Sequence, residues 1–265
     1  MNNQMYYIHP NAKIGKNVTI EPFAVIYDDV EIGDDCWIGP HVTIFPGARI
    51  VKNCKIFPGA VIGGIPQDLK FAGEVSWVEI GDNTVIRECA TINRGTAASG
   101  KYLTKIGNNC LIMSYAHVAH DCRIGDHVIQ VSYTGLAGES EVDDWAIIGG
   151  ASVAHQFTKI GAHAMIQGGS KIGKDVPPYA MAGREPLAFC GINIVGLRRR
   201  GFTLEQIERI REIYKVIYNS GLNRSDACNV LENEFPASEE KDVILNFIRN
   251  SKRGIIKFTE LSADE

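Results

Sequence analysis

Ten isoleucines stand at a strict six-residue spacing between residues 8 and 62. An α-helix repeats every ~3.6 residues and an amphipathic strand every two, so neither accounts for this period. A repeat of six is typical of a solenoid in which each repeat forms one short strand and one turn, that is, a parallel β-helix. The pattern resumes over residues 80–172, where Gln130 and Ala154 stand at positions that otherwise carry Ile, Leu or Val.

Three such hexads are expected to close one coil of eighteen residues. Residues eighteen apart should therefore lie above one another, separated by one strand spacing of ~4.8 Å. Two stretches interrupt the repeat: residues 64–76 carry Asp68 and Glu74 at hexad positions, and residues 94–105 break the six-residue phase. We expect both stretches to leave the coil as loops, which is where functional residues tend to lie.

The hexads end near Pro178, and this divides the chain. We expect residues 1–178 to form the β-helix and residues 179–201, which contain glycine and proline, to form a connector. Residues 202–265 are expected to form a small α-helical domain. The overall prediction is an all-β parallel solenoid followed by helices, because repeats of this kind cannot bury their own ends.

Helix signals mark the last part of the chain. Thr203 precedes a segment with an apolar residue at every third or fourth position, so we expect it to be an N-cap. Ser225 and Ser238 are expected to cap two further helices, which should end near Phe235 and Asn250. The inward Gln130 is expected to be a buried amide without a partner, at a cost of ~1 to 3 kcal/mol.

Composition narrows the class of protein. Of 265 residues, 45% are hydrophobic and 22% are charged, and no apolar run approaches the ~18 residues of a membrane span. We therefore expect no membrane span and a cytoplasmic location. The net charge of −4 gives no reason to expect nucleic acid as a partner. Seven cysteines without a Cys-x-x-Cys pair argue against a disulfide framework and a zinc ribbon.

One cluster of residues could carry chemistry. His120, Gly138 and Gln156 are eighteen apart, so they should stack in successive coils, with His155 beside them. A glycine next to an imidazole leaves room and exposes a backbone N–H, which pairs a general base with an oxyanion donor, as acyl transfer requires. Asp121 could hold the imidazole in its useful tautomer.

Other interpretations remain open. Surface histidines are often simply solvated, and Gly138 could be a turn residue with positive φ. His117, His120 and His155 could instead bind a metal ion such as zinc. A neighbouring column of small residues would leave a groove suited to an alkyl chain, or could satisfy the tight corners of the repeat; it contains Ser114, Ser132, Gly150 and Gly168.

Over nearly its whole length the chain resembles the acyl carrier protein–UDP-N-acetylglucosamine O-acyltransferases, which catalyse the first step of lipid A biosynthesis. The joined motifs that carry this resemblance are Gly-Gly-Ile-Pro-Gln-Asp-Leu-Lys-Phe-Ala-Gly-Glu at 63–74, Ala-His-Val-Ala-His-Asp-Cys at 116–122, Val-Ala-His-Gln-Phe at 153–157, Asp-Val-Pro-Pro-Tyr at 175–179 and Gly-Ile-Asn-Ile-Val-Gly-Leu-Arg-Arg-Arg-Gly-Phe at 191–202. The resemblance implies a homotrimer of left-handed parallel β-helices with active sites between neighbouring subunits.

The resemblance also implies roles for residues. It makes His120 the general base, Asp121 its aid and Gly138 the oxyanion donor, with Gly150 and Gly168 in an open groove for the acyl chain. The residues that it places around the sugar nucleotide or toward the carrier protein are Gln67, Asp68, Lys70, His117, Glu139, His155, Gln156, Asn193, Arg199 and Arg200.

Two positions depart from the pattern of the family. Glu139 stands where Ala-Gly-His is common, and Asn93 stands where Thr-Ile-His-Arg-Gly is common. Glu139 should stack beside Asp121, and two poorly solvated acids in adjacent coils are expected to raise one another's pKa.

The predicted reaction moves an (R)-3-hydroxyacyl group from acyl carrier protein to the 3-hydroxyl of UDP-N-acetylglucosamine. It requires no bound cofactor and no metal ion. The acidic carrier protein would be attracted by basic residues late in the chain. Two alternatives stay open, because fold alone does not decide function: a zinc-dependent hydratase similar to γ-carbonic anhydrase, and a non-catalytic solenoid that binds a sugar nucleotide.

Overall fold

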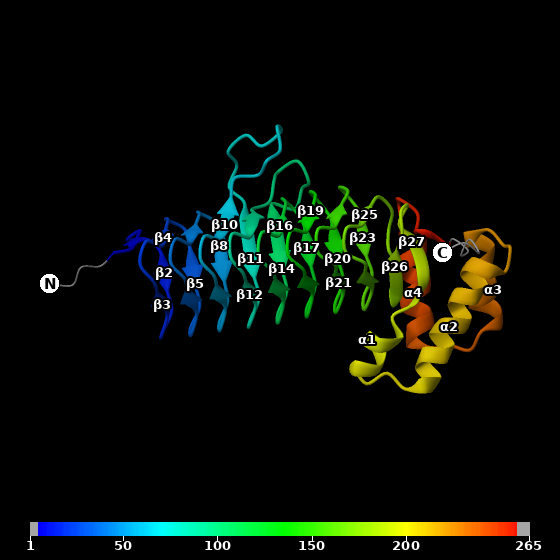
Figure 1. The fold of residues 1–265 in the computed structure, drawn as a ribbon. Coiled ribbons are helices and arrows are strands. Elements are labelled where there is room, and N and C mark those ends of the chain that lie inside the picture. The colour runs from blue at the N-terminus through cyan, green and yellow to red at the C-terminus, as the bar shows by residue number, and fades with distance from the viewer. Residues whose placement is uncertain (1–4, 259–265) are drawn as a thin grey trace.

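The computed structural model describes residues 5–258. Short strands joined by tight turns stack into three long sheets that run the length of the solenoid (Figure 1). The first sheet contains β1 (Tyr7–Ile8), β4 (Val25–Ile26), β7 (Thr43–Ile44), β10 (Val61–Gly64), β13 (Thr91–Asn93), β16 (His117–Val118), β19 (Gly135–Leu136), β22 (Val153–Ala154) and β25 (Lys171–Ile172). The second contains β2 (Lys13–Ile14), β5 (Glu31–Ile32), β8 (Ala48–Ile50), β11 (Trp77–Ile80), β14 (Leu103–Ile106), β17 (Arg123–Ile124), β20 (Glu141–Val142) and β23 (Lys159–Ile160).

The third sheet continues beyond the repeats into the C-terminal part. It contains β3 (Thr19–Ile20), β6 (Trp37–Ile38), β9 (Lys55–Ile56), β12 (Val85–Ile86), β15 (Leu111–Ile112), β18 (Ile129–Gln130), β21 (Ile147–Ile148), β24 (Met165–Ile166), β26 (Ala180–Gly183), β27 (Ala188–Ile192) and β28 (Lys257–Phe258). The left-handed parallel β-helix followed by helices is thereby confirmed.

The hexad residues form the core. Ile26 pairs in register with Ile44, and Ile44 with Ile62, which confirms the eighteen-residue coil. All three are fully buried. Gln130 is also fully buried, and its Nε2 donates to the carbonyl oxygen of His117 at 3.1 Å. The expectation of a partnerless amide is therefore wrong for the nitrogen, whereas Oε1 has no hydrogen-bond donor within residues 5–258.

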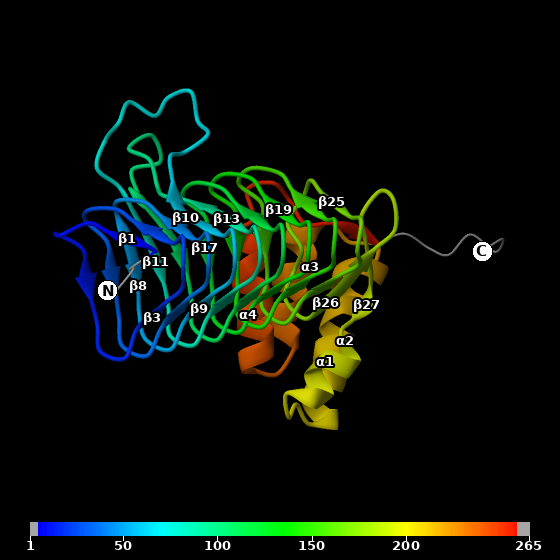
Figure 2. The ribbon, with the colours of Figure 1, turned by 60° about the vertical axis from the view of Figure 1, so that its left-hand side comes forward.

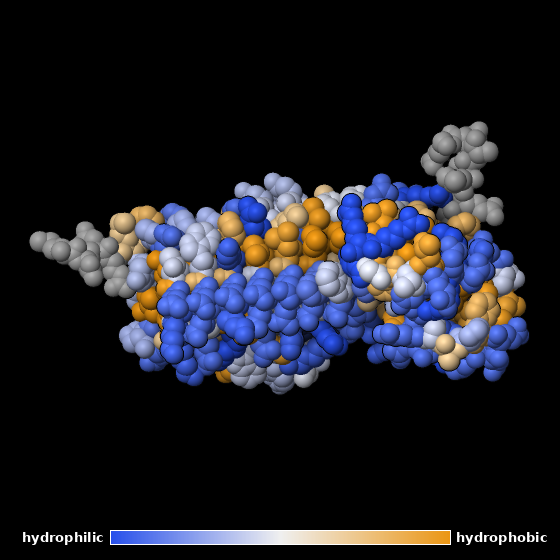
Figure 3. Space-filling model, turned by 90° about the horizontal axis from the view of Figure 1, so that it is seen from below, coloured by the Kyte–Doolittle hydropathy of each residue, from blue (hydrophilic) through white to orange (hydrophobic). Residues whose placement is uncertain are grey.

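The outward-facing residues differ between sheets. Those of the second sheet are mostly charged, with opposite signs in most neighbouring coils, and form ion pairs such as Lys13–Glu31 at 2.7 Å and Lys159–Glu141 at 3.0 Å. A hydrophilic band runs along the solenoid, with hydrophobic residues gathered beside it (Figure 3). The partly exposed outward residues in the middle of the third sheet are apolar: Val85, Leu111, Ile129, Ile147 and Met165. One face of the solenoid is therefore suited to water and another to a packing partner.

Both expected loops leave the coil on the same side (Figure 2). The first joins β10 to β11 over residues 65–76, and the second joins β13 to β14 over residues 94–102. The second is shorter than the predicted 94–105, because residues 103–105 already pair in register with residues 77–79. The carboxylate of Glu74 ties the loops together by accepting the N–H of Ala97 at 2.7 Å.

The predicted connector is structured. β26 and β27 pair antiparallel, and the short helix α1 (Ile194–Arg199) follows. The helical part then contains α2 (Leu204–Asn219), α3 (Arg224–Glu234) and α4 (Glu239–Arg249). None of the helices in the described part is long and apolar enough to cross a membrane.

Helix caps follow the sequence with one exception. Thr203 forms a capping box with Gln206, and Ser238 caps α4 through the N–H of Lys241. The prediction of Ser225 as a cap is wrong, because the side chain of Asn223 accepts the N–H of Asp226 and starts α3 two residues earlier. An asparagine at this position satisfies an N–H that the helix itself leaves unpaired.

The helices close the end of the solenoid. Phe189 on β27 packs against the rings of Tyr214 and Tyr218 on α2, with centroids 4.9 and 4.4 Å away. The hydroxyl of the buried Tyr214 donates to the carbonyl oxygen of Pro178 at the end of the repeats. This contact covers core surface that the last coil would otherwise leave open.

Candidate functional site

His120 and Asp121 form a hydrogen-bonded pair in the turn after β16. Nδ1 of His120 lies 2.8 Å from Oδ2 of Asp121. Both are buried, with 9% of His120 and 1% of Asp121 exposed. Asp121 adopts a left-handed backbone conformation, and its N–H donates to the hydroxyl of Thr104 at 2.7 Å. Because Nδ1 makes the contact with Asp121, Nε2 of His120 is left without a hydrogen bond to that carboxylate.

The second loop binds the carboxylate of Asp121. Oδ1 accepts the N–H of Thr96 at 2.9 Å and the hydroxyl of Ser99 at 2.6 Å, and Oδ2 accepts the hydroxyl of Thr96 at 2.7 Å. Burial raises the pKa of Asp121, but the bonds from Ser99, Thr96 and His120 together hold it below its ordinary value. The expectation that Glu139 raises the pKa of Asp121 is wrong, because these donors stabilise the anion.

Gly138 lies directly against the ring of His120. A Cβ on residue 138 would lie 2.5 Å from both Cε1 and Nε2 of the imidazole, closer than any real side chain approaches. No acceptor for the Gly138 N–H is found among residues 5–258, whereas its carbonyl oxygen accepts the N–H of Phe157 at 3.2 Å. Nε2 of the imidazole therefore packs against a residue whose backbone N–H has no partner in the described part of the chain.

These groups open into a hollow of about 430 Å³. Its polar lining comes from Gln67, His117, His120 and Gln156, and its apolar lining from residues on β19 and β22 such as Leu136 and Ala154. Polar groups set in a mostly apolar concave surface are typical of a small-molecule site. The stacking of residues 120, 138 and 156 expected from the eighteen-residue period thus brings all three to one hollow.

The first loop and β13 complete the surroundings of the imidazole. Oδ2 of Asp68 lies 4.0 Å from Nε2 of His120, and the N–H of Lys70 donates to Oδ1 of Asp68 at 3.0 Å. Nδ1 of His117 lies 2.8 Å from the hydroxyl of Thr91. Burial, and then the neighbouring His120, lower the pKa of His117, which favours its neutral form.

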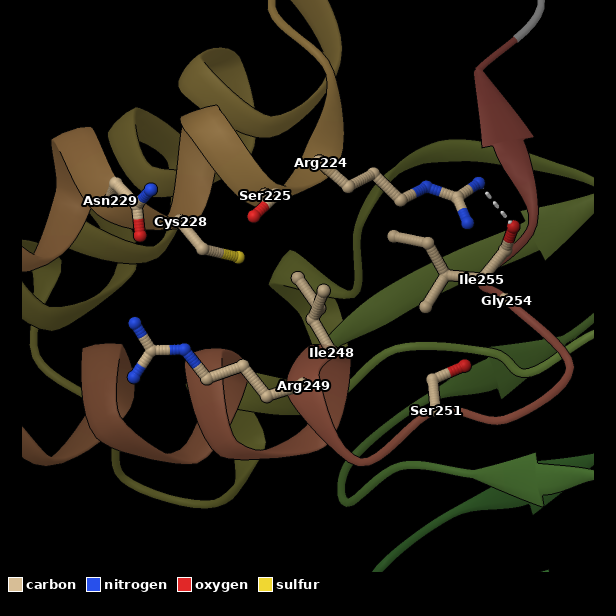
Figure 4. A pocket seen from close by; sticks show the side chains of 9 residues that line it. All are labelled: Arg224, Ser225, Cys228, Asn229, Ile248, Arg249, Ser251, Gly254 and Ile255. Atoms are coloured by element: carbon tan, nitrogen blue, oxygen red, sulfur yellow. Dashed lines mark hydrogen bonds between the residues drawn. The ribbon is translucent and has the colours of Figure 1, made fainter.

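A second hollow of about 310 Å³ lies in the helical part (Figure 4). Its two guanidinium groups are already engaged: Arg224 donates to the carbonyl oxygen of Ile255 at 2.7 Å, and Arg249 forms two hydrogen bonds with Glu232. The thiol of Cys228 points into it, and burial raises the pKa of this group. Without a free base beside an activating donor, this hollow is a weaker candidate for chemistry than that of His120.

Comparisons with known proteins identify the family. Residues 175–256 match the family described as UDP N-acetylglucosamine O-acyltransferase, domain 2, and residues 11–46 and 103–129 match the bacterial transferase hexapeptide family. A protein from Thermodesulfovibrio yellowstonii named acyl-(acyl-carrier-protein)–UDP-N-acetylglucosamine O-acyltransferase is 44% identical over 94% of this chain and 96% of its own length. The chain belongs to this acyltransferase family. The solved UDP-N-acetylglucosamine acyltransferase of Bacteroides fragilis is similar at 55% identity, with a TM-score of 0.93 over 97% of this chain and 100% of that one.

Several residues that the acyltransferase family suggests lie outside the hollow in a single chain. Asn193 is buried and caps α1, and its Nδ2 donates to the carbonyl oxygen of His163 at 2.9 Å. Arg200 lies over the ring of Trp145 at 5.3 Å. Arg199 is exposed on α1. These residues therefore lie on a different corner of the solenoid from His120.

The remaining predicted positions are also placed. His155 is exposed, and its Nδ1 lies 3.0 Å from the carbonyl oxygen of Gln156. Gly150 and Gly168 stack in successive coils, because the N–H of residue 169 donates to the carbonyl oxygen of Gly150 at 2.8 Å. A Cβ on Gly168 would approach that oxygen to 3.0 Å. Neither glycine lines the hollow of His120.

Glu139, which stands where the resemblance leads us to expect a histidine, has a partner of its own. Its Oε2 lies 3.9 Å from Nζ of Lys101 on the second loop. Its backbone N–H donates to the carbonyl oxygen of His120 at 3.0 Å. The carboxylate of Glu139 is thus accompanied by a lysine of opposite charge in the same chain.

Metal coordination was the main alternative for the histidines. Within residues 5–258 no group of three or more His, Cys, Asp or Glu side chains is arranged to hold a metal ion. His117 and His120 meet at the hollow, but His155 turns to the backbone of its neighbour. The arrangement of these three side chains in one subunit therefore does not resemble a tetrahedral zinc site.

Sequence reasoning missed Thr96 and Ser99. Both belong to the predicted second loop, yet nothing in the hexad period shows that this loop folds back onto Asp121. The available signal was the hydroxyl content of a loop expected near a buried acid, since such acids need hydrogen-bond donors.

Proposed function

We propose that the protein transfers an (R)-3-hydroxyacyl group from acyl carrier protein to the 3-hydroxyl of UDP-N-acetylglucosamine, the first step of lipid A biosynthesis. The names of its relatives include an acyl-(acyl carrier protein) and UDP-N-acetylglucosamine as substrates. The observation that supports this chemistry is the close packing of Nε2 of His120 against Gly138, whose N–H has no acceptor among residues 5–258, at the wall of a hollow. Attack of a hydroxyl on a thioester requires a base that removes the hydroxyl proton and a nearby donor that stabilises the negative charge on the carbonyl oxygen.

The proposed reaction proceeds in two stages. Nε2 of His120 removes the proton of the sugar 3-hydroxyl as its oxygen attacks the thioester carbon, and the carbonyl oxygen gains a negative charge that the N–H of Gly138 stabilises. The intermediate then collapses, the carbon–sulfur bond breaks, and the carrier thiol leaves with the proton held by His120. Asp121 stabilises the imidazolium that exists between the stages.

We assign the remaining residues from the resemblance to the acyltransferase family and, where they lie at the hollow, also from their place. Gln67, Asp68, Lys70, His117 and Gln156 lie in or beside the hollow and would bind the sugar nucleotide, together with Glu139 and His155. Gly150 and Gly168 would leave space for the acyl chain. Asn193, Arg199 and Arg200 would contact the nucleotide or the carrier protein. The carrier protein is acidic, so the positive charge of the two arginines would favour its approach.

We also propose that the protein acts as a homotrimer with sites between subunits. The apolar outward residues in the middle of the third sheet would be covered by a neighbouring copy, as in other homo-oligomers. Ile129→Asp places a charge on this face. Sedimentation equilibrium should show a trimer for the parent protein and smaller species for the variant; a parent monomer would contradict the assembly.

The reaction is tested with UDP-N-acetylglucosamine and 3-hydroxyacyl carrier proteins of graded chain length. His120→Ala should abolish transfer, whereas His41→Ala, which removes an exposed histidine stacked on Phe23, should retain it. Turnover by His120→Ala would refute the role of the base. Binding of the sugar nucleotide without turnover would select the non-catalytic alternative, and activity that depends on stoichiometric zinc would select the hydratase.

A further inference from the structure

The carboxylate of Asp121 is saturated with hydrogen bonds. An ionised carboxylate offers about four positions to donors. Here the four contacts are the N–H of Thr96, the hydroxyl of Thr96, the hydroxyl of Ser99 and Nδ1 of His120, at distances of 2.6 to 2.9 Å. Three of the four come from the loop of residues 94–102, which is remote in sequence from the pair it contacts.

The two hydroxyl protons have little choice of direction. The hydroxyl of Ser99 accepts the N–H of Lys101 at 3.0 Å, and the hydroxyl of Thr96 accepts the N–H of Ser99 at 3.4 Å. Each oxygen thus receives a backbone donor and keeps its own proton to donate. For Thr96 the acceptor is Asp121; for Ser99 the carbonyl oxygen of Thr96 at 3.1 Å competes with the closer Asp121 at 2.6 Å.

The loop that supplies these donors is itself fixed. The N–H of Tyr102 donates to the carbonyl oxygen of Thr96 at 3.1 Å, which closes the loop on itself. The N–H of Gly95 donates to the carbonyl oxygen of Trp77, and the N–H of Ala97 to the carboxylate of Glu74 on the other loop. Thr96 is 1% exposed. The donors are therefore held in place before any substrate binds.

We propose that Thr96 and Ser99 are positioning residues for the general base: by filling the other acceptor positions of Asp121 they keep it an anion aimed at Nδ1 of His120, so that Nδ1 carries the proton and Nε2 the lone pair. This inference deepens the proposed function and rests on His120 as the base. A ring with the opposite tautomer would present an N–H to the sugar hydroxyl and could not accept its proton.

Other charged and titratable groups lie near the pair of His120 and Asp121. Glu139 lies in the next coil and faces Lys101, Asp68 faces Nε2 of His120, and His117 lies across the hollow. None of them donates a hydrogen bond to Asp121. The donors that can be removed from the carboxylate without touching the base are thus the hydroxyls of Thr96 and Ser99.

The test uses Thr96→Val, Ser99→Ala and their combination in the full-length protein. Each removed hydrogen bond to a charged group should lower kcat/KM roughly 10- to 100-fold. Because the buried carboxylate loses donors to its anion, its pKa rises and it becomes a stronger acceptor for Nδ1–H of His120. The protonated form of the base is then stabilised more, so the acidic limb of the profile of kcat/KM against pH should move to higher pH. Thr96→Ser keeps the hydroxyl and should restore the parent profile.

Matched controls separate positioning from loss of a buried hydroxyl. Thr158→Val and Ser140→Ala remove buried hydroxyls that donate to the carbonyl oxygens of residues 155 and 137 and do not contact Asp121. These controls should leave the acidic limb in place. The half-buried Ser99→Ala is the mildest change and keeps the test available if the double variant does not fold.

A second readout does not depend on turnover. In protein labelled with 15N-histidine, chemical shifts distinguish a protonated ring nitrogen from a bare one, and His120→Gln identifies the signals of His120. The parent should show Nδ1–H with a bare Nε2, and the double variant a mixture of tautomers. An unchanged tautomer and an unmoved acidic limb in the double variant would overturn the inference, whereas a parent protein with the expected tautomer but no acyl transfer would overturn only the proposed function.

Discussion

Gly138→Ala tests the geometry of the site through a single methyl group. The new Cβ would lie 2.5 Å from Nε2 and Cε1 of His120, whereas ordinary contacts begin at 3.4 Å, so the imidazole must move by about 0.9 Å. The ring is buried and bonded to Asp121 at 2.8 Å, which leaves it little free space. A displacement of about 1 Å at a reacting group costs on the order of 10²-fold in rate, or about 2.7 kcal/mol.

The assay is steady-state acyl transfer with both substrates varied. The alanine keeps its backbone N–H, so a fall in kcat of about 100-fold with a nearly unchanged KM would report displacement of the base. Gly173→Ala is the control, because a Cβ there meets no atom within 4 Å. A kcat for Gly138→Ala within about threefold of the parent would refute the tight packing of the glycine against the base.

Three further changes test stability. Gln130→Leu should raise the melting temperature by a few degrees, because it removes an unsatisfied buried carbonyl oxygen that costs about 1 kcal/mol or more. A lower melting temperature would show that the bond from Nε2 to the carbonyl oxygen of His117 is worth more than the unsatisfied oxygen costs. Thr203→Ala should lower the free energy of unfolding by about 1 kcal/mol in urea titrations and leave kcat unchanged, since it removes a capping box remote from the hollow. Burial, and then Arg200, lower the pKa of His163 to about 4, so the unfolded chain binds more protons than the folded one between pH 6.5 and 4. Stability from His163 is therefore complete above pH 6.5 and lost as pH falls toward 4, and His163→Phe should lessen that loss in denaturation midpoints at pH 7 and 4.5.

The repeats could be predicted because the six-residue period of the sequence corresponds directly to one strand and one turn of the coil. An isoleucine at every sixth residue faces the interior of the coil. Isoleucines eighteen residues apart then lie in neighbouring coils, as the register of Ile26, Ile44 and Ile62 shows. The same eighteen-residue period predicted that Gly138 lies next to His120, because stacking within the coil depends only on sequence separation. Even the turn positions are periodic: Asp121 and Glu139, eighteen apart, both have positive φ.

Contacts made outside the coil were not predictable in this way. The approach of Asp68 to His120 and of Thr96 to Asp121 depends on the path of two loops, and no period describes those paths. The connector shows the same limit. Its glycines and prolines suggest irregular structure, but β26 and β27 continue the third sheet because the last coil offers an unpaired strand edge.

The coil and the two loops contribute different features to the site. The coil fixes His120 against Gly138 through backbone stacking, which a loop could not hold to a fraction of an ångström. The loops supply what a coil of six-residue repeats cannot, namely hydrogen-bond donors that approach Asp121 from outside the stack. A buried carboxylate beside a base is useful only as an anion, and burial by itself favours the protonated acid. The solenoid therefore needs an interruption at this point, and the loss of hexad phase between β13 and β14 is the sequence feature that provides it.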